Sequence, residues 1–254
     1  MTQKLRIAAC QFPVSCDIAS NAKFIRRLMK KAAGAAAEVV HFPETALSGY
    51  ERSDFMPFDV DNWHCLEEQT EAIAGLAKEL GMWVVFGSCR KVNGMENPAN
   101  CIHVISNTGR IIGTYDKQKL TSAESAWYTP GNGLLVVTIN GINCGFLICY
   151  ELCFPALFET YRKKGVRLIF HSSHTISRKP KPLFQELTSA QIRTRAADNQ
   201  MWISGSASSA RHSFSTSCVA RPDGSVRRLK RHANGILLHD FPDTELGWMY
   251  DNAA

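Results

Sequence analysis

Cys149 is the residue whose position most clearly suggests chemistry. It follows the apolar run 144–148 and precedes Tyr150 and a helix-like segment that begins near Cys153. A strand-to-helix turn of this kind exposes a side chain at the carboxyl end of a strand and aims the following backbone N–H groups at whatever the sulfur attacks. Free cysteine is also among the most buried residue types. The position alone therefore allows two interpretations, a nucleophile and an inert buried thiol.

Three charged residues follow strand-like runs or lie in the loops beyond them. Glu44 comes after the run 38–42, and a carboxylate at a strand end can act as a general base if its surroundings raise its pKa toward neutrality. Lys117 comes after the run 110–116, where a cation could stabilise an oxyanion and lower the pKa of a thiol. Glu124 lies in the next loop and could orient the lysine or a substrate amide. Each of them could equally be an ordinary solvated side chain.

These residues can meet only if the strands that precede them end at a common edge. Short β-like runs alternate with helical patterns, which is typical of strand–helix–strand units with a partly parallel sheet. The apolar spacing predicts strands at 5–12, 38–42, 82–88, 166–173 and 201–208, and helices at 21–37, 61–80, 154–164 and 184–199.

Turn signals predict that the other strands form hairpins. NCIHVIS and RIIGTYD flank the turn 107–109, and LLVVTI and INCGFLIC flank Asn140-Gly141, the strongest short hairpin signal. The sequence then returns to β structure with FSTSCVA, the turn 222–224, SVRRL and GILLHDF. No linker, repeat or low-complexity segment divides the sequence, so we expect one domain over residues 1–254. In it, two sheets face each other and helices cover their outer faces.

Composition excludes several classes of protein. The chain has 254 residues, 45% hydrophobic and 20% charged, as in ordinary globular proteins. Its net charge of +6 suits anionic substrates, but the basic runs lack interleaved aromatics, so we expect no nucleic-acid partner. No apolar stretch approaches a membrane span and no secretory signal is seen, so we expect no membrane partner and a cytoplasmic location. The nine cysteines form no Cys-x-x-Cys pair, which argues against a disulfide framework or zinc site. Five are expected to be buried in strand-like runs: Cys10, Cys89, Cys101, Cys144 and Cys218.

Three sequence blocks resemble the signatures of one family. They are HFPE (41–44) with GY (49–50), YDKQKL (115–120) and GFLICYELCFP (145–155). Further matching stretches are VVFGS, NPANCIHVISNTGRIIGTY, RAADN and SFSTSCVARPDG. Together they resemble the nitrilase superfamily of carbon–nitrogen hydrolases, in the family's order and along the whole chain. The resemblance implies an α/β fold, a four-layer αββα sandwich with two mixed β-sheets flanked by helices.

The resemblance also implies roles for the residues at strand ends. By the family's pattern Cys149 is the nucleophile, Glu44 the general base and Lys117 the oxyanion stabiliser, together with the backbone N–H of Tyr150. Glu124 matches a second glutamate that precedes an aromatic-Pro-Gly segment. Amide hydrolysis needs these parts: an activated nucleophile, a proton carrier and a charge opposite the developing oxyanion. The carboxylate would pass the thiol proton to departing ammonia and later activate the water that hydrolyses a thioester.

The chain departs from the family's pattern at three positions. Lys119 stands where the family usually has histidine, and between the two lysines we favour Lys117 as catalytic. Cys153 replaces an arginine, and Ala156 an acid, of many amidases. Tyr150-Glu151 resembles the amidase and carbamoyl-hydrolase branches, since true nitrilases carry Trp-Glu. We therefore expect an amidohydrolase for a small amide, an ω-amide of a carboxylate. The alternatives are an N-carbamoyl amine or amino-acid hydrolase and a non-catalytic binding member of the family.

Substrate contacts are less well determined by the sequence. The candidates are Tyr50, Trp127, Phe154, Ser173 and His174. Aromatic residues at such positions are more often core, and a loop histidine such as His171 or His174 is more often simply hydrogen-bonded. The basic segment 178–181 could hold a substrate carboxylate, because arginine suits bidentate recognition, or it could be a solvated loop.

The resemblance also bears on partners. Members of the family usually form dimers by packing helices of two sandwiches together, so we expect a homodimer or a higher even-numbered oligomer. The expected ligand is a small-molecule amide. No cofactor is implied, and His171 and His174, three residues apart without nearby acids, make a poor metal site, so we expect no metal ion either.

Overall fold

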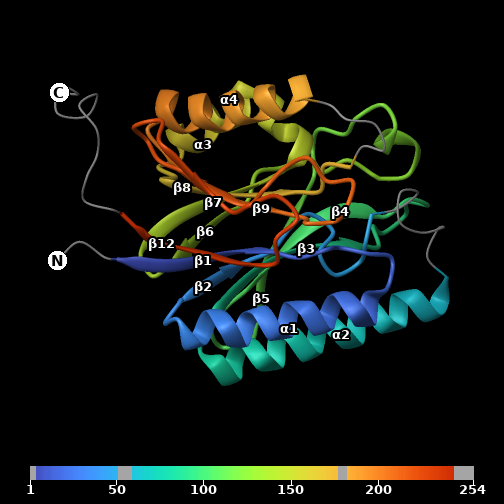
Figure 1. Ribbon diagram of the computed structural model, residues 1–254. Helices are drawn as coiled ribbons and strands as arrows, with labels where there is room; N and C mark the ends of the chain where they lie inside the picture. The colour runs from blue at the N-terminus through green and yellow to red at the C-terminus, as the bar shows by residue number, and fades with distance from the viewer. Residues whose placement is uncertain (1–3, 51–58, 177–181, 243–254) are drawn as a thin grey trace.

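The computed structural model describes residues 4–50, 59–176 and 182–242 of the chain. Within these ranges twelve strands form two six-stranded sheets. Figure 1 shows the two sheets stacked in the middle of the molecule, with one pair of helices below them and another pair above. The predicted four-layer αββα sandwich is therefore confirmed.

The first sheet has the strand order β12-β1-β2-β3-β4-β5. Its strands are β1 (Leu5–Gln11), β2 (Val39–His41), β3 (Trp83–Arg90), β4 (Ala99–Ile105), β5 (Ile111–Asp116) and β12 (Gly235–Phe241). Strands β1, β2 and β3 are parallel, and the remaining neighbours pair antiparallel. Strands β2 and β5 consequently point the same way, so the loops that follow them emerge at one edge of the sheet.

The second sheet has the strand order β11-β10-β9-β8-β7-β6. Its strands are β6 (Val136–Ile139), β7 (Ile142–Ile148), β8 (Leu168–Ser173), β9 (Trp202–Ala207), β10 (Cys218–Ala220) and β11 (Val226–Arg228). Strands β7, β8 and β9 are parallel, whereas β6, β10 and β11 pair antiparallel with their neighbours. The predicted hairpins at 107–109, 140–141 and 222–224 are all present.

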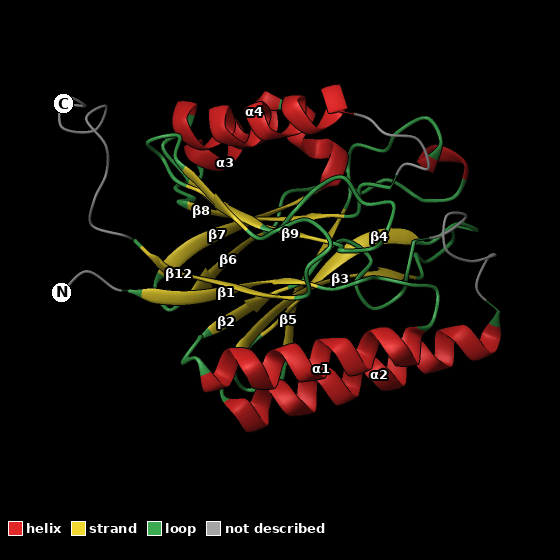
Figure 2. Ribbon diagram, in the orientation of Figure 1, coloured by secondary structure: helices red, strands yellow, loops and turns green. Residues whose placement is uncertain are grey.

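Each outer face of the sandwich is covered by two helices (Figure 2). These are α1 (Ile18–Gly34) and α2 (Val60–Leu80) on the first sheet, and α3 (Pro155–Lys163) and α4 (Pro182–Asp198) on the second. Asp17 and Asp59 cap the first two helices by accepting a hydrogen bond from a backbone N–H three residues on. None of the helices in the described ranges is long and apolar enough to span a bilayer.

Two predicted helix boundaries were wrong for local reasons. The predicted helix 21–37 begins and ends three residues earlier, because Asp17 is the cap. The predicted helix 154–164 begins at Pro155, a usual first helical residue, and a separate 3₁₀ turn, Cys149–Cys153, precedes it. This short turn carries the candidate nucleophile.

The helices differ in how firmly they join the core. Helix α1 buries seven residues against the first sheet, whereas α4, of the same length, buries only Ile192 and Ala196 among its described side chains. The five cysteines predicted to be buried are buried, in agreement with their place in apolar strands. Strands therefore supply most of the core around the second sheet, and α4 lies more loosely over it.

Candidate active site

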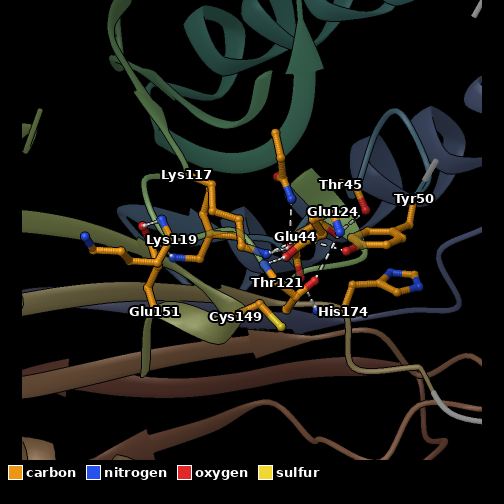
Figure 3. Close-up of polar contacts among 12 residues, drawn as sticks. Glu44, Thr45, Tyr50, Lys117, Lys119, Thr121, Glu124, Cys149, Glu151 and His174 are labelled. Atoms are coloured by element: carbon orange, nitrogen blue, oxygen red, sulfur yellow. Dashed lines mark hydrogen bonds and ion pairs between the residues drawn. The ribbon is translucent and has the colours of Figure 1, made fainter. Parts of the chain in front are cut away.

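The predicted catalytic side chains lie at the edge where parallel strands end. Glu44 follows β2, Lys117 directly follows β5, and Cys149 directly follows β7. Glu124 begins a 3₁₀ turn, Glu124–Ala126, in the loop beyond Lys117. Figure 3 shows the two carboxylates and the lysine pointing at one another, with the cysteine sulfur beside them.

Lys117 forms the centre of a buried ion cluster. Its Nζ donates to Glu44 Oε1 at 2.8 Å and also to Glu124 Oε1. The lysine side chain is 1% exposed and the two carboxylates are 0% and 3% exposed. Charges removed from water in this way persist only when they are paired, so the three side chains hold each other in place.

Glu44 is oriented by two further donors. Asn100 Nδ2 donates to Glu44 Oε1, and the backbone N–H of His174 donates to Oε2, both at 2.8 Å. The turn that carries Glu44 packs on Gly87 of β3, where a Cβ atom would lie 2.3 Å from the carbonyl oxygen of Pro43. Only glycine permits this close approach of two backbones. The carboxylate is thus fixed both by its hydrogen bonds and by its turn.

Glu124 is held by a second set of contacts. The Tyr50 hydroxyl donates to Glu124 Oε1 at 2.6 Å, and the backbone N–H of Thr121 donates to Oε2 at 2.8 Å. The Tyr50 ring stacks on His174 with centroids 5.7 Å apart. Tyr50 therefore contacts both Glu124 and His174, the residue whose backbone N–H donates to Glu44.

Cys149 has a backbone conformation that is unusual for its residue type. Its φ is +46°, in the left-handed region that favours glycine, and it opens the 3₁₀ turn after β7. Such strain is maintained only where surrounding contacts impose it, and it projects a side chain sharply out of the strand. The Cys149 carbonyl is hydrogen-bonded to His171 Nε2 at 3.1 Å.

Glu151 ties the cysteine turn to the lysine loop. Its Oε2 accepts from the backbone N–H of Ile148 at 2.7 Å, and its Oε1 accepts from the Tyr115 hydroxyl and the backbone N–H of Gln118, each at 2.8 Å. The carboxylate is fully buried. It therefore fixes Cys149 relative to Lys117 through hydrogen bonds to residues next to them in the sequence.

The cluster shifts the pKa values of its members in different directions. Burial raises the pKa of Glu44 above its ordinary value against the opposing charge of Lys117. Burial also favours the neutral form of Glu124, but the lysine charge and hydrogen bonds hold its pKa below the ordinary value. Burial opposes the charge of Lys117, yet the carboxylates and the thiol raise its pKa. Burial and Glu44 together raise the pKa of Cys149, so the resting site contains a thiol, an ammonium group and a carboxylate with increased proton affinity.

A pocket of about 230 Å³ opens at the thiol. Its polar lining includes Ser173 and His174, two of the predicted substrate contacts, and Tyr150. Its apolar lining consists of Leu152, Ile176, Phe184, Leu187 and Phe214. None of the described residues that line it carries a charged side chain. The space beside the thiol therefore suits an uncharged group.

The other three predicted substrate contacts, Tyr50, Phe154 and Trp127, are not among the described residues that line this pocket. Tyr50 and Phe154 contact residues that do, and the prediction for Trp127 was wrong. Tyr50 belongs to the carboxylate cluster, and the Phe154 ring lies edge-on against Tyr150 with centroids 5.2 Å apart. Trp127 packs against the core between the first sheet and its helices. The basic segment 178–181 lies outside the described residues.

Three residues of the site, Asn100, Thr121 and Glu151, were not assigned a role from the sequence. For His171 the sequence left a substrate contact or a simple hydrogen bond open; it lines the pocket and is hydrogen-bonded to the Cys149 carbonyl. Asn100, Thr121, Glu151 and His171 contact the cluster or the cysteine turn through side-chain or backbone hydrogen bonds. Glu151 stands within the third signature block, which was the available signal for it. Asn100 lies at the start of β4, and its proximity to Glu44 depends on sheet register. Within the described part of the chain, no group of three or more His, Cys, Asp or Glu side chains could hold a metal ion.

Solved structures show the same architecture. An amidase from Nesterenkonia sp. AN1 aligns with a TM-score of 0.81 over 94% of this chain and 91% of its own, at 20% identity. In another structure of that amidase, acrylamide is added to its active-site cysteine. The alignment shows a common fold, and a thiol beside a buried lysine–carboxylate cluster is the type of site that nucleophilic hydrolysis requires.

Sequence comparisons identify the family. Omega-amidase NIT2 of Danio rerio is 29% identical over 79% of this chain and 73% of its own length. The chloroplastic omega-amidase of Arabidopsis thaliana is 25% identical over 92% of this chain and 67% of its own length. Deaminated glutathione amidase of Bos taurus is 25% identical over 91% of this chain and 75% of its own length. The carbon-nitrogen hydrolase family model matches residues 6–244. The chain belongs to the carbon–nitrogen hydrolase family, and the expectation of such an enzyme is confirmed.

Proposed function

We propose that the chain is a thiol-dependent amidase that passes through a thioester on Cys149. The observation that carries this proposal is the buried cluster in which Lys117 joins Glu44 and Glu124 beside the thiol. A buried carboxylate with a raised pKa is suited to accept a proton, and a buried ammonium group is suited to face an oxyanion. The amidase names of the relatives support the same reaction.

The first half of the reaction forms the thioester. Glu44 accepts the Cys149 proton as the sulfur attacks the amide carbon, and the carbonyl oxygen becomes an oxyanion. Lys117 Nζ and the backbone N–H of Tyr150 stabilise that charge. When the tetrahedral intermediate collapses, the C–N bond breaks and the nitrogen takes the proton from Glu44, so ammonia leaves.

The second half regenerates the thiol. Glu44, now unprotonated, accepts a proton from water as the water oxygen attacks the thioester carbon. The C–S bond of the second tetrahedral intermediate breaks, and the proton returns from Glu44 to the sulfur of Cys149. The acid product departs, and the cluster returns to its initial charges.

We infer further that the substrate is an ω-amide of a carboxylate. A groove of about 680 Å³ adjoins the uncharged pocket and shares His171 and Ser173 with it. Three arginines, Arg193, Arg228 and Arg231, line this groove against one described carboxylate, that of Glu186. An amide in the uncharged pocket would therefore carry its anionic end toward guanidinium groups, which suit carboxylates. Two relatives named omega-amidases support this inference.

Ammonia release from a panel of ω-amides, carbamoyl compounds and nitriles tests the reaction. Cys149→Ala should abolish release, and the acyl mass should appear on the Cys149 peptide of the wild type after rapid quenching. Cys153→Ala is the matched control, because that cysteine lines the same pocket. Unchanged release by Cys149→Ala would overturn the proposal. Carbon dioxide with an amine among the products would identify an N-carbamoyl hydrolase instead.

The substrate class has its own test. Arg231→Gln should raise KM for a carboxylate-bearing ω-amide about tenfold, since a hydrogen bond to a charged group contributes about 1.5–3 kcal/mol. KM for a neutral amide of similar length should stay unchanged. An equal effect on both amides would contradict the assignment of the groove.

We also propose a homodimer of single-domain chains with a cytoplasmic location. Leu183, Phe184 and Leu187 on α4 are 73%, 50% and 47% exposed, an apolar face that a second copy could cover. Light scattering at micromolar concentration should give twice the chain mass of 28.2 kDa, and Leu183→Glu should shift the mass toward the monomer. A monomeric wild-type protein would contradict this assembly.

A further inference from the structure

A second polar pocket lies at the end of the sandwich opposite the thiol. Its volume is about 360 Å³, within the range of about 300–1,000 Å³ found for small-molecule sites. Lys4 and Arg6 stand at the start of β1, whereas Glu44 follows the far end of the parallel strand β2. Trp202 likewise starts β9 on the other sheet. Figure 1 shows the start of β1 beside the end of β12. The pocket is lined by residues of these two strands and of β9, β10 and β11.

The lining of this pocket is strongly basic. Among the described residues, four cationic side chains contribute to it, Lys4, Arg6, Arg221 and Arg227, against one carboxylate, that of Asp240. Arg6 already holds Asp240 through two hydrogen bonds, at 2.7 and 3.2 Å. Guanidinium groups match the oxygens of carboxylates and phosphates. The charge therefore favours a ligand with more than one negative charge.

His239 adds a buried polar atom to the lining. It is 6% exposed, and its Nδ1 has no hydrogen-bond partner among the described residues. A buried polar atom without a partner carries a desolvation cost that a ligand oxygen or a bridging water would relieve. Burial and the charges of Arg227 and Arg221 lower the pKa of His239 to about 3, so the imidazole is neutral and has one N–H to donate.

A chain of hydrogen bonds runs from His239 through the core to the active site. His239 Nε2 contacts Ser204 Oγ at 3.4 Å, and the same hydroxyl contacts His41 Nδ1 at 3.2 Å. His41 Nε2 contacts Ser172 Oγ at 3.0 Å, and that hydroxyl donates to the carbonyl of Phe42 at 2.9 Å.

The hydrogen bond between Ser172 and Phe42 joins two segments that hold Glu44, the proposed general base. Phe42 is two residues before Glu44, and Ser172 is two residues before His174, whose backbone N–H donates to the Glu44 carboxylate. The four side chains of this hydrogen-bond path, His239, Ser204, His41 and Ser172, are all buried. In such a network a change of tautomer at one imidazole changes which neighbour donates and which accepts.

We propose that the basic pocket is an effector site for a small, multiply charged oxyanion, a phosphate ester or a polycarboxylate. The anion contacts Arg221, Arg227 and the Nδ1 atom of His239. It thereby fixes the tautomer of His239, and the Ser204–His41–Ser172 hydrogen bonds carry this preference to the turn that holds Glu44. Occupancy of one end of the sandwich then alters kcat/KM at the other.

Calorimetric titration with pyrophosphate and with citrate, at constant ionic strength set by sodium chloride, tests the binding step. The anion that binds more tightly identifies phosphate or carboxylate chemistry. Arg221→Gln combined with Arg227→Gln should weaken binding about tenfold or more. Arg110→Gln is the matched control, since Arg110 is an exposed arginine just before β5 and lines neither this pocket nor the groove beside the thiol pocket. Absence of binding, or equal binding by the double variant, would overturn the proposal.

Kinetics tests the coupling step separately. The better anion should change kcat/KM of the wild type at least about threefold, and Ser204→Ala should retain anion binding but lose that change. Retention of the full effect in Ser204→Ala would overturn the transmission path, and binding with no kinetic effect would overturn the effector role. Neither result depends on which amide is the substrate, because relative rates on any active amide suffice.

Discussion

The two ends of the sandwich accommodate charge in opposite ways. At the catalytic end Lys117 is enclosed with Glu44 and Glu124, and the three side chains are between 0% and 3% exposed. At the other end Arg6 and Asp240 pair while 46% and 47% exposed, among further cations that exceed the acids. Buried charges depend on every partner, whereas exposed charges are screened by water. We therefore expect substitutions at the catalytic end to have large effects on activity and stability that depend on one another. Substitutions at the basic end should have small and independent effects.

Among substitutions of the charged residues, Glu44→Gln should have the largest effect on the rate. Loss of the proton carrier should lower kcat by about 10²–10⁴-fold. Combination with Cys149→Ala should add little, because residues that act in one step are not additive. Steady-state and single-turnover ammonia assays measure both quantities. If the loss of kcat in the double variant equalled the product of the two single losses, the two residues would act independently.

Lys117→Met should be the most destabilising of the changes considered. It leaves two carboxylates buried without their cation, and breaking a buried ion pair costs about 3–5 kcal/mol. Lys119→Met is the matched control, because Lys119 is exposed two residues away. Denaturant unfolding gives both free energies. A loss of less than about 1 kcal/mol for Lys117→Met would mean that water solvates the cluster.

Asn100→Ala should move the pH profile of kcat/KM. Glu44 must be unprotonated to act as the base, so activity falls as the pH drops through its raised pKa. The Asn100 amide stabilises the charged carboxylate and lowers that pKa, so its loss should shift the acid limb about one unit toward higher pH. A shift toward lower pH would exclude Glu44 as the group that titrates.

Asp240→Asn should have the smallest effect on stability. The Arg6–Asp240 pair is about half exposed, and such pairs contribute about 0–1 kcal/mol. The pKa of Asp240 lies below its ordinary value because of the hydrogen bond from Arg6, so the contribution is present above the ordinary pKa and is lost as the pH falls through the lowered one. Unfolding at pH 7 and pH 3 measures the difference. A loss above about 2 kcal/mol would remove the contrast between the two ends.

Local patterns predicted much of the fold. Apolar runs and turn residues identified the strands, and the positions just beyond strand ends singled out Glu44, Lys117 and Cys149. The resemblance to known signature blocks then supplied roles that spacing alone left open. The helix starts at Ile18 and Pro155 were misplaced because a single capping residue or a short 3₁₀ turn outweighed the periodic pattern.

The supporting residues of the site depend on long-range register. Asn100 reaches Glu44 across a separation of 56 residues because β4 pairs with β3 and β5 in one particular register. Glu151 joins its turn to a loop 33 residues earlier. The buried hydrogen bond between His41 and Ser204 joins the two sheets, although these residues are 163 positions apart in the sequence. No local pattern specifies such pairings.

The φ of +46° at Cys149 places a non-glycine residue in a strained conformation, which lowers the stability of the fold at the residue proposed to carry the reaction. Glycine adopts this conformation without strain, so Cys149→Gly should fold at least as firmly as the natural chain while losing the sulfur. Laboratory evolution that selects only for heat resistance would therefore be expected to discard the thiol early. Under the proposed mechanism, the backbone strain at this turn is offset only by the role of the sulfur as nucleophile.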